Sequence, residues 1–281
     1  MHLQNELHSS LKAIEIGLKS FQSDGERSHL AYMLTIMKAS VLEKLDRNAE
    51  ALQLVEETWE NRGNYVWFSN GLLNLIQIRV ELLNKMGLYE KAIPIAKEGL
   101  TFAKLDSNID RIFELLSSLG EANAGIGKLQ VAKLYYQKAN ELESKISRKS
   151  LAITTYTQLG KVYSRQGEWK MAETNLKHAV KIGDDDEYRL CKALTALGDL
   201  YYRREQYEKA YPVLEQAWKI AQKSTLDESA CDILLLLSSV SKHLRSTEYT
   251  NYTDTLVDVL TLVRKEGGKI MTNFVNDPPM E

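Results

Sequence analysis

The sequence has no apolar run long enough to cross a membrane. A transmembrane helix needs about 20 consecutive, mainly apolar residues, and no stretch of these 281 residues approaches that length. The N-terminal residues MHLQNELHSS are polar and charged where a secretory signal would place its apolar core. We therefore expect no association with a membrane and a location in the cytoplasm.

Signatures of catalysis are missing as well. The sequence contains no phosphate-binding glycine loop, no HExxH or CxxC motif and no nucleophile elbow. Its five histidines are dispersed, and none lies four residues from another. His178, which lies beside Ala179 in a helical pattern, is interpreted as a helix-surface or inter-repeat residue rather than a ligand. We predict that the chain is not an enzyme, and we expect no cofactor and no metal.

Proline is scarce, and the sequence has no excess of positive charge. Only four prolines occur, which leaves room for long helices. The net charge is -2, whereas proteins that bind nucleic acids usually carry a basic excess. We therefore expect no direct binding to DNA or RNA. A hydrophobic content of 44% and a charged content of 26% are ordinary for a folded protein.

One stretch, from Tyr188 to Ala221, carries the pattern that the rest of the chain repeats. Leu194, Leu197, Gly198 and Tyr201 fall at positions i, i+3, i+4 and i+7, which places them on one stripe of a helix. Residues 203–206 then form a polar corner. Small and large residues resume the helical spacing at Ala210, Leu214 and Ala217. The stretch therefore predicts a hairpin of two helices that touch through small residues.

The pattern recurs upstream at intervals of about 40 residues. Glycine occupies the same place in three first helices, at Gly120, Gly160 and Gly198. A turn residue follows the first helix of the earlier copies, at Asp46, Gly87, Gly127 and Gly167. Cys191 and Cys231 lie one period apart, which separates them too widely for a disulfide. We interpret both as buried thiols.

The spacing Leu-x2-Leu-Gly-x2-Tyr, followed by Ala-x3-Leu, resembles the tetratricopeptide repeat, with a period of about 40 instead of 34. The resemblance implies an all-α, right-handed superhelical solenoid of antiparallel helix pairs with about 13 helices. We predict one solenoid over residues 1–267, comprising a helix at 1–22, hairpins at 26–61, 65–104, 107–144, 151–182 and 187–222, and a capping hairpin at 227–266. Residues 268–281 are predicted to be a flexible tail.

The first helix leaves two readings open. Either residues 1–22 form a helix that caps the array, or a part upstream of them has been lost from a longer ancestor. At other helix starts, Ser107 with Asp110 resembles a capping box. Three acids at residues 184–186 precede a helix whose positive end they would complement, so we favour capping over a cation site. The segment SKISRKS, residues 144–150, is a polar, basic link.

Two groups of large side chains are interpreted as packing residues. Met33, Ile36 and Met37 form a stripe that we assign to the core, although methionines also serve as adaptable binding surfaces. Tyr65, Trp67 and Phe68 cluster at a bend and are expected to seal adjacent hairpins.

In the tetratricopeptide family, the first helices of the hairpins line a concave groove that binds peptides or proteins. In this sequence, the resemblance implies that the groove is lined by polar residues beside the packing stripe of each first helix. The earlier positions are acidic and the later ones basic, which suits an extended ligand that binds in one direction. The predicted binding residues are Gln77, Glu81, Asn84, Ser117, Glu121, Thr157, Lys161, Arg165, Asp199, Tyr202 and Arg203.

The long period is also similar to the repeat domains of Rap-type and PlcR-type peptide-sensing regulators. Several such families place asparagine directly after the helix glycine to hold the ligand backbone. Here those positions are Glu121, Lys161 and Asp199, so the chain departs from that pattern. We predict a non-catalytic scaffold that binds a peptide or protein partner. The alternatives are a ligand-sensing regulatory domain and a non-catalytic subunit of an enzyme complex, and terminal helices offer a route to a homo-oligomer.

Overall fold

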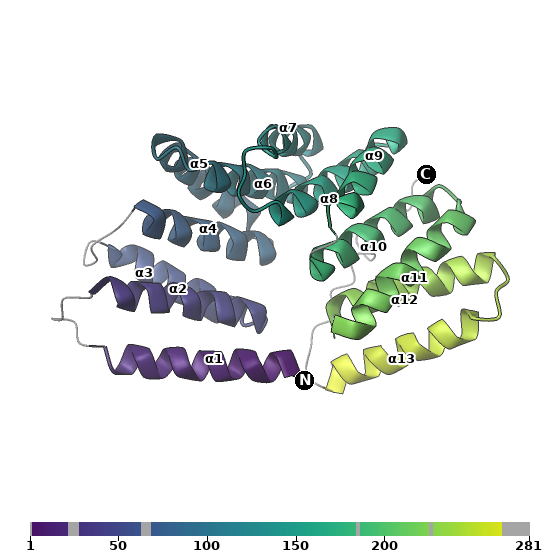
Figure 1. Ribbon diagram of the computed structural model, residues 1–281, viewed down its shortest axis with the longest axis horizontal. Helices are drawn as coiled ribbons and strands as arrows, with labels where there is room; N and C mark the ends of the chain where they lie inside the picture. The colour runs from purple at the N-terminus through teal and green to yellow at the C-terminus, as the bar shows by residue number, and fades with distance from the viewer. Residues whose placement is uncertain (1, 22–27, 63–68, 184–185, 225–226, 266–281) are drawn as a thin grey trace. The chain divides into compact units, whose positions relative to one another are not determined.

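The computed structural model describes residues 2–21, 28–62, 69–183, 186–224 and 227–265. These ranges hold thirteen α-helices and no strand (Figure 1). The number and the pairing of helices confirm the prediction. The helices are α1 (His2–Lys19), α2 (Ser28–Lys44), α3 (Asn48–Glu60), α4 (Ser69–Lys85), α5 (Tyr89–Leu105), α6 (Ile109–Gly125), α7 (Leu129–Asn140), α8 (Ser150–Arg165), α9 (Trp169–Lys181), α10 (Glu187–Arg203), α11 (Tyr207–Ser224), α12 (Asp227–His243) and α13 (Tyr249–Lys265).

The chain divides into two compact units, Met1–Ser147 and Arg148–Glu281. The division falls inside the basic segment 144–150. Unit 1 holds α1 to α7, and unit 2 holds α8 to α13. In the described part of each unit, every helix–helix contact joins helices that are one or two apart in chain order. First helices therefore pack beside the next first helix, as α4 does on α6 and α10 on α12.

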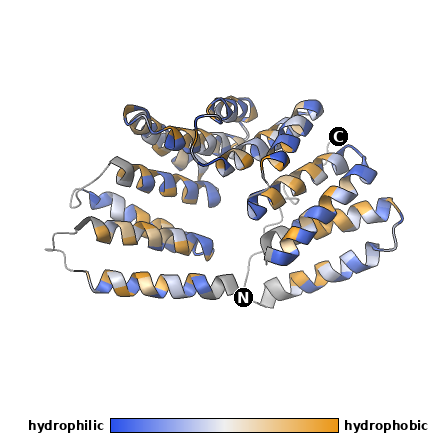
Figure 2. Cartoon of the chain, viewed as in Figure 1, coloured by the Kyte–Doolittle hydropathy of each residue, from blue (hydrophilic) through white to orange (hydrophobic). Residues whose placement is uncertain are grey.

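Hydrophobic and hydrophilic residues are mixed along every helix (Figure 2), as a helix with one buried stripe requires. In unit 1, Leu42, Ala51 and Leu75 join α2, α3 and α4 in one core cluster. A second cluster joins α4, α5 and α6 through Ile76, Ala96 and Leu119. In unit 2 the core includes Ile153, Leu176, Leu194, Leu214 and Leu234, all fully or almost fully buried. Each such leucine contributes about 1.5–3 kcal/mol of transfer free energy.

The corner of each hairpin has the same backbone conformation. One residue at each of the six corners lies in the left-handed region, and the residue after it donates its N–H to a carbonyl five positions earlier, as Leu88 does to Leu83 at 2.8 Å. Glycine suits that region because it has no Cβ. The corner residues and their φ angles are Asp46 (57°), Gly87 (73°), Gly127 (79°), Gly167 (72°), Glu205 (56°) and Arg245 (53°).

The helix glycines allow a close approach between the two helices of a hairpin. A Cβ on Gly120 would lie 2.6 Å from Tyr136, and a Cβ on Gly198 would lie 2.4 Å from Leu214. In both pairs the large residue lies sixteen positions after the glycine. The predicted role of these glycines as contact points is therefore confirmed.

The helix starts agree only in part with the expected caps. Asn108, and not Ser107, caps α6, since its side chain accepts the N–H of Arg111 at 3.2 Å. The cap shifts because Ser107 takes a positive φ at the end of the preceding turn. Asp186 caps α10 as predicted, accepting from the N–H of Arg189 at 3.0 Å.

Other expectations concern packing or fall outside the described residues. The assignment of Met33 and Met37 to the core is wrong: 53% and 51% of their surfaces are exposed, and only Ile36 of that stripe packs against the core.

Two prolines, Pro94 and Pro212, lie inside α5 and α11, which continue past them. Outside the described part lie the aromatic cluster at 65, 67 and 68, the acids at 184 and 185, and the tail at 268–281.

Candidate functional site

The eleven predicted binding residues lie on first helices of the hairpins, five on α4 and α6 in unit 1 and six on α8 and α10 in unit 2. We call the surface that these helices present, with α2 in unit 1 and α12 in unit 2, the first-helix face. It has a separate part in each unit.

In unit 1, amide side chains connect α4 to α6 and to nearby carboxylates. The Nε2 of Gln77 donates to Oε1 of Glu81 at 2.7 Å and to Oγ of Ser118 at 3.4 Å. The Nδ2 of Asn84 donates to the carbonyl of Ser118 at 3.0 Å and to Oε2 of Glu121 at 3.4 Å. Both amides are buried, and these bonds give their N–H groups the acceptors that a buried amide needs. Glu81 and Glu121 remain exposed.

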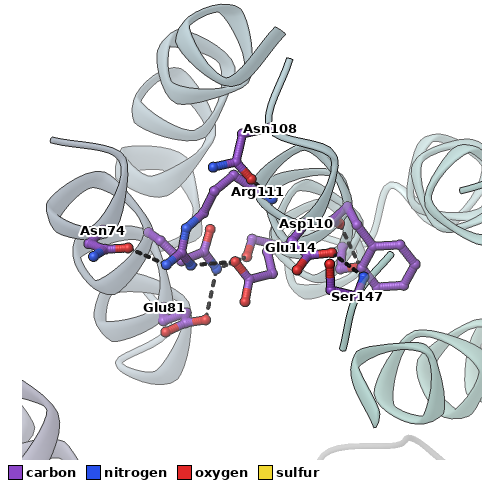
Figure 3. A network of polar contacts seen from close by, with 11 residues as sticks. Asn74, Glu81, Asn108, Asp110, Arg111, Glu114 and Ser147 are labelled. Carbon is purple, nitrogen blue, oxygen red and sulfur yellow. Dashed lines mark hydrogen bonds and ion pairs between the residues drawn. The ribbon is translucent and has the colours of Figure 1, made fainter. Parts of the chain in front are cut away.

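A second set of bonds on these two helices was not predicted (Figure 3). Arg111 of α6 donates to Asn74 of α4 and to Glu114, one turn away on its own helix. Asp110 accepts the N–H of Ser147 at 2.7 Å. Helix periodicity places Arg111 and Glu114 on one side of α6, but it does not reveal a bond to another helix. Ser117, which was predicted to bind, bonds back to the carbonyl of Phe113 at 3.0 Å.

The unit 1 part of the face is acidic. Four carboxylates contribute, from Glu43 on α2, Glu81 on α4, and Glu114 and Glu121 on α6. Surrounding protein desolvates Glu81, and its three acidic neighbours add repulsion, so that its pKa rises to about 7. The side chain itself is exposed. Water therefore screens part of the repulsion among these carboxylates.

The unit 2 part is basic around Lys161. This lysine is exposed, and desolvation, followed by the charge of Lys192, lowers its pKa; Arg165 acts in the same sense, whereas Asp199 opposes the shift. Asp199 accepts from Nε of Arg203 at 2.8 Å. Thr157 is buried and bonds back to the carbonyl of Ile153 at 2.7 Å, so its hydroxyl serves its own helix.

Tyr202 contacts an aromatic group that the sequence did not reveal. Its ring centroid lies 5.9 Å from that of Tyr207 on α11 and 6.3 Å from that of His243 on α12, and these last two rings stack at 4.3 Å. His243 stands at the end of its helix, where a helical pattern gives no signal of a contact. His178, by contrast, packs edge-on against Tyr156 of its own hairpin at 4.3 Å, so this contact lies within one repeat, whereas one of the two expected readings placed it between repeats.

The described residues contain no group of three or more His, Cys, Asp or Glu side chains placed to hold a metal ion. Nor does any helix in the described ranges have the length and apolar character needed to cross a membrane. Cys191 and Cys231 are both buried free thiols, as predicted.

Comparisons with known proteins agree with the fold. Residues 151–223 match the family model described as tetratricopeptide repeat. The comparison with curated protein sequences gave no match.

Among solved structures, NprR in complex with its cognate peptide NprX has a TM-score of 0.68 at 12% identity over 94% of this chain and 77% of that chain. The Rap protein complexed with Competence and Sporulation Factor has a TM-score of 0.67 at 15% identity over 84% of this chain and 70% of that one. BtubC (BKLC) from P. vanneervenii has a TM-score of 0.59 at 18% identity, covering 89% and 96%. These identities show a shared fold, and the predicted resemblance to tetratricopeptide and Rap-type proteins is confirmed.

Proposed function

We propose that this tetratricopeptide-repeat chain is a non-catalytic scaffold that binds a peptide or a segment of a partner protein on its first-helix face. The observation that carries the proposal is the crowding of like charges in each unit. Glu81 lies among the carboxylates of Glu43, Glu114 and Glu121, and Lys161 lies near Lys192 and Arg165. A ligand of opposite charge would relieve both arrangements.

In the free protein, the charged forms of Glu81 and Lys161 are destabilised by their surroundings. The pKa of Glu81 is raised and that of Lys161 is lowered, so the charged form of each is disfavoured. Surfaces that hold like charges together are typical of sites prepared for a charged ligand, although structural networks also shift pKa values. Basic residues of a ligand satisfy the unit 1 part, and acidic residues satisfy the unit 2 part. We expect it to bind as an extended chain or as a helix.

A second candidate function is peptide sensing, in which binding changes the shape of the repeats and so controls an effector. The solved structures of NprR with the peptide NprX and of Rap with Competence and Sporulation Factor favour it. The two functions differ in their consequences. A sensor changes its small-angle scattering profile when it binds, and a scaffold keeps its profile.

The test begins with a display library of random ten-residue peptides selected on the full chain. Calorimetry then compares one selected peptide on the parent protein and on two double variants. Lys161→Ala with Arg165→Ala should weaken binding about tenfold at low salt and less at high salt, because exposed charges are screened. Lys138→Ala with Glu141→Ala, two exposed residues at the C-terminal end of α7, is the control and should leave the affinity unchanged.

Two results would contradict the proposal. One is a library from which no peptide is enriched. The other is equal affinity of both double variants and the parent for every selected peptide, which would place binding away from the unit 2 part of the face.

A further inference from the structure

The face of unit 1 has more hydrogen-bond acceptors than donors around Glu81. Gln77 is only 4% exposed, and its Nε2 is used by Glu81 and Ser118. Its Oε1 is buried and receives no hydrogen bond from any described residue. A buried amide oxygen without a donor is destabilising, so the site is incomplete as it stands.

Asn84, nearly two turns further along α4, repeats the arrangement. It is 3% exposed, and its Nδ2 is used by the carbonyl of Ser118 and by Glu121. Its Oδ1 is also buried and meets no donor in the described part of the chain. The two amides thus use their N–H groups on α6 and on carboxylates, and each keeps an unused oxygen.

The charged groups around Glu81 are mostly acidic. Glu43 faces it from α2, and Glu114 and Glu121 face it from α6. The nearby cations form ion pairs with carboxylates other than Glu81: Lys85 lies 3.8 Å from Glu43, and Arg111 pairs with Glu114. The other helices that pack against α4 are α3 and α5. Arg79 of α4 forms an ion pair with Glu56 of α3 at 2.6 Å, and the residues that α5 buries are alanines and Gly99. Glu81 itself accepts from the neutral amide of Gln77.

We propose that Glu81 receives a lysine or arginine side chain of the bound segment, so that unit 1 selects basic peptides. The proposal rests on the proposed function, and it names the chemistry of the ligand at one place. Lysine and arginine side chains bring only donors, three and five N–H groups respectively, together with a positive charge. Such a ligand supplies what the carboxylate and the neighbouring amide oxygens lack. Gln77 can turn its amide and present Oε1 once the cation has taken Glu81.

Protonation gives the site a measurable signature. With a pKa of about 7, Glu81 is about half protonated at neutral pH. A bound cation favours the carboxylate and lowers this pKa, so binding at pH 7 should release about half a proton. Affinity for the basic peptide should therefore rise as the pH increases through 7 and fall below it.

The peptide display library provides the first experiment. Selection on the parent chain should enrich lysine or arginine, and selection on Glu81→Gln should lose that enrichment. Glu98→Gln, the same substitution at an exposed glutamate of α5, is the matched control and should keep it. Peptides enriched without basic residues would overturn this inference and leave the proposed function standing. A library from which nothing is enriched would overturn both.

Calorimetry on one enriched basic peptide provides the second experiment. Titrations at pH 7 in phosphate and in Tris, which differ in ionisation enthalpy, count the protons that binding releases. We expect about half a proton for the parent and for Glu98→Gln, and none for Glu81→Gln, with an affinity about tenfold weaker. A parent protein that releases no proton, or a Glu81→Gln variant that binds as tightly as the parent at pH 8, would refute the role of Glu81.

Discussion

A Cβ atom on Gly160 would lie only 2.6 Å from Cγ of Leu176, sixteen residues later on the facing helix. Real Cβ atoms essentially never come so close, so the Leu176 side chain or one of the two helices would have to move. In the α4–α5 hairpin the larger residue of this contact lies on the first helix and the smaller one on the second. There Val80 and Ala96, both fully buried, occupy the matching positions, counted from the corner.

This relationship predicts that Gly160→Val destabilises the protein and that Leu176→Ala, added to it, restores part of the loss. Overpacking a tight contact costs about 1–3 kcal/mol. Urea unfolding measures the free energy of each variant. If the double variant loses the sum of the two single losses, the two positions do not form one contact.

The corners predict opposite effects for two exchanges with glycine. Glu205 has a φ of 56°, and for a residue with a side chain this conformation costs about 1 kcal/mol or more. Glu205→Gly should therefore stabilise unit 2 by about 0.5–1 kcal/mol, and Gly167→Ala should destabilise it by about 1 kcal/mol. Glu208→Gly, in the first turn of α11, is the control and should destabilise. Thermal unfolding followed by circular dichroism would show the order, and a less stable Glu205→Gly would contradict it.

Cys191 should be unreactive in the folded protein. Burial raises its pKa to about 11, and its Sγ donates to the carbonyl of Ala217 at 3.5 Å. At pH 8 almost no thiolate is present, and the thiolate is the reactive form. A thiol reagent such as iodoacetamide should modify Cys191 only after unfolding, as peptide mass mapping would show. Rapid modification in native buffer would mean that this part of unit 2 opens readily.

Glu81 should make the stability of unit 1 depend on pH. Its folded-state pKa of about 7 exceeds the ordinary value of 4.5, so the folded state binds the proton more tightly than the unfolded state does. The resulting cost is absent below about pH 4.5, grows as the pH rises, and is complete above about pH 7. Relative to the parent, Glu81→Gln should gain up to about 1 kcal/mol across that window, after allowance for solvent screening.

Urea unfolding at pH 4.5, 6 and 8 measures this difference, with Glu98→Gln as the control that shows no trend. A difference between Glu81→Gln and its parent that stays constant from pH 4.5 to 8 would exclude the raised pKa.

Much of the fold could be predicted because the repeat encodes it locally. Gly87, Gly127 and Gly167 mark corners, and Gly120, Gly160 and Gly198 mark contacts, so residue type alone locates both. Glu205 and Arg245 form the same corner without glycine, and there the neighbouring copies supply the signal. Ser107 shows the limit: a cap depends on the φ of one residue, which sequence spacing does not determine.

Less of the candidate site could be predicted. Polarity suggested that Gln77 and Asn84 face a ligand, whereas packing of α4 against α6 buries them and Ser118 bonds to them. The exposure of Met33 and Met37 was missed for the converse reason, since apolar character does not show which side of α2 lacks a neighbour. A helical period gives the direction of each side chain around its own axis, and the position of the next helix decides which of those side chains are buried. Binding by the eleven residues stays a prediction.

The limited range of the helix contacts has a consequence for how the chain acquires its structure. Within the described part of each unit, a helix contacts helices no more than two places away along the sequence, so only short loops have to close before native contacts form. Topologies of this kind fold within microseconds to milliseconds, and stability accumulates from neighbour to neighbour. Amide hydrogens should therefore exchange fastest in helices with one neighbour, such as α1 and α13, and slowest in helices flanked on both sides, such as α4 and α10.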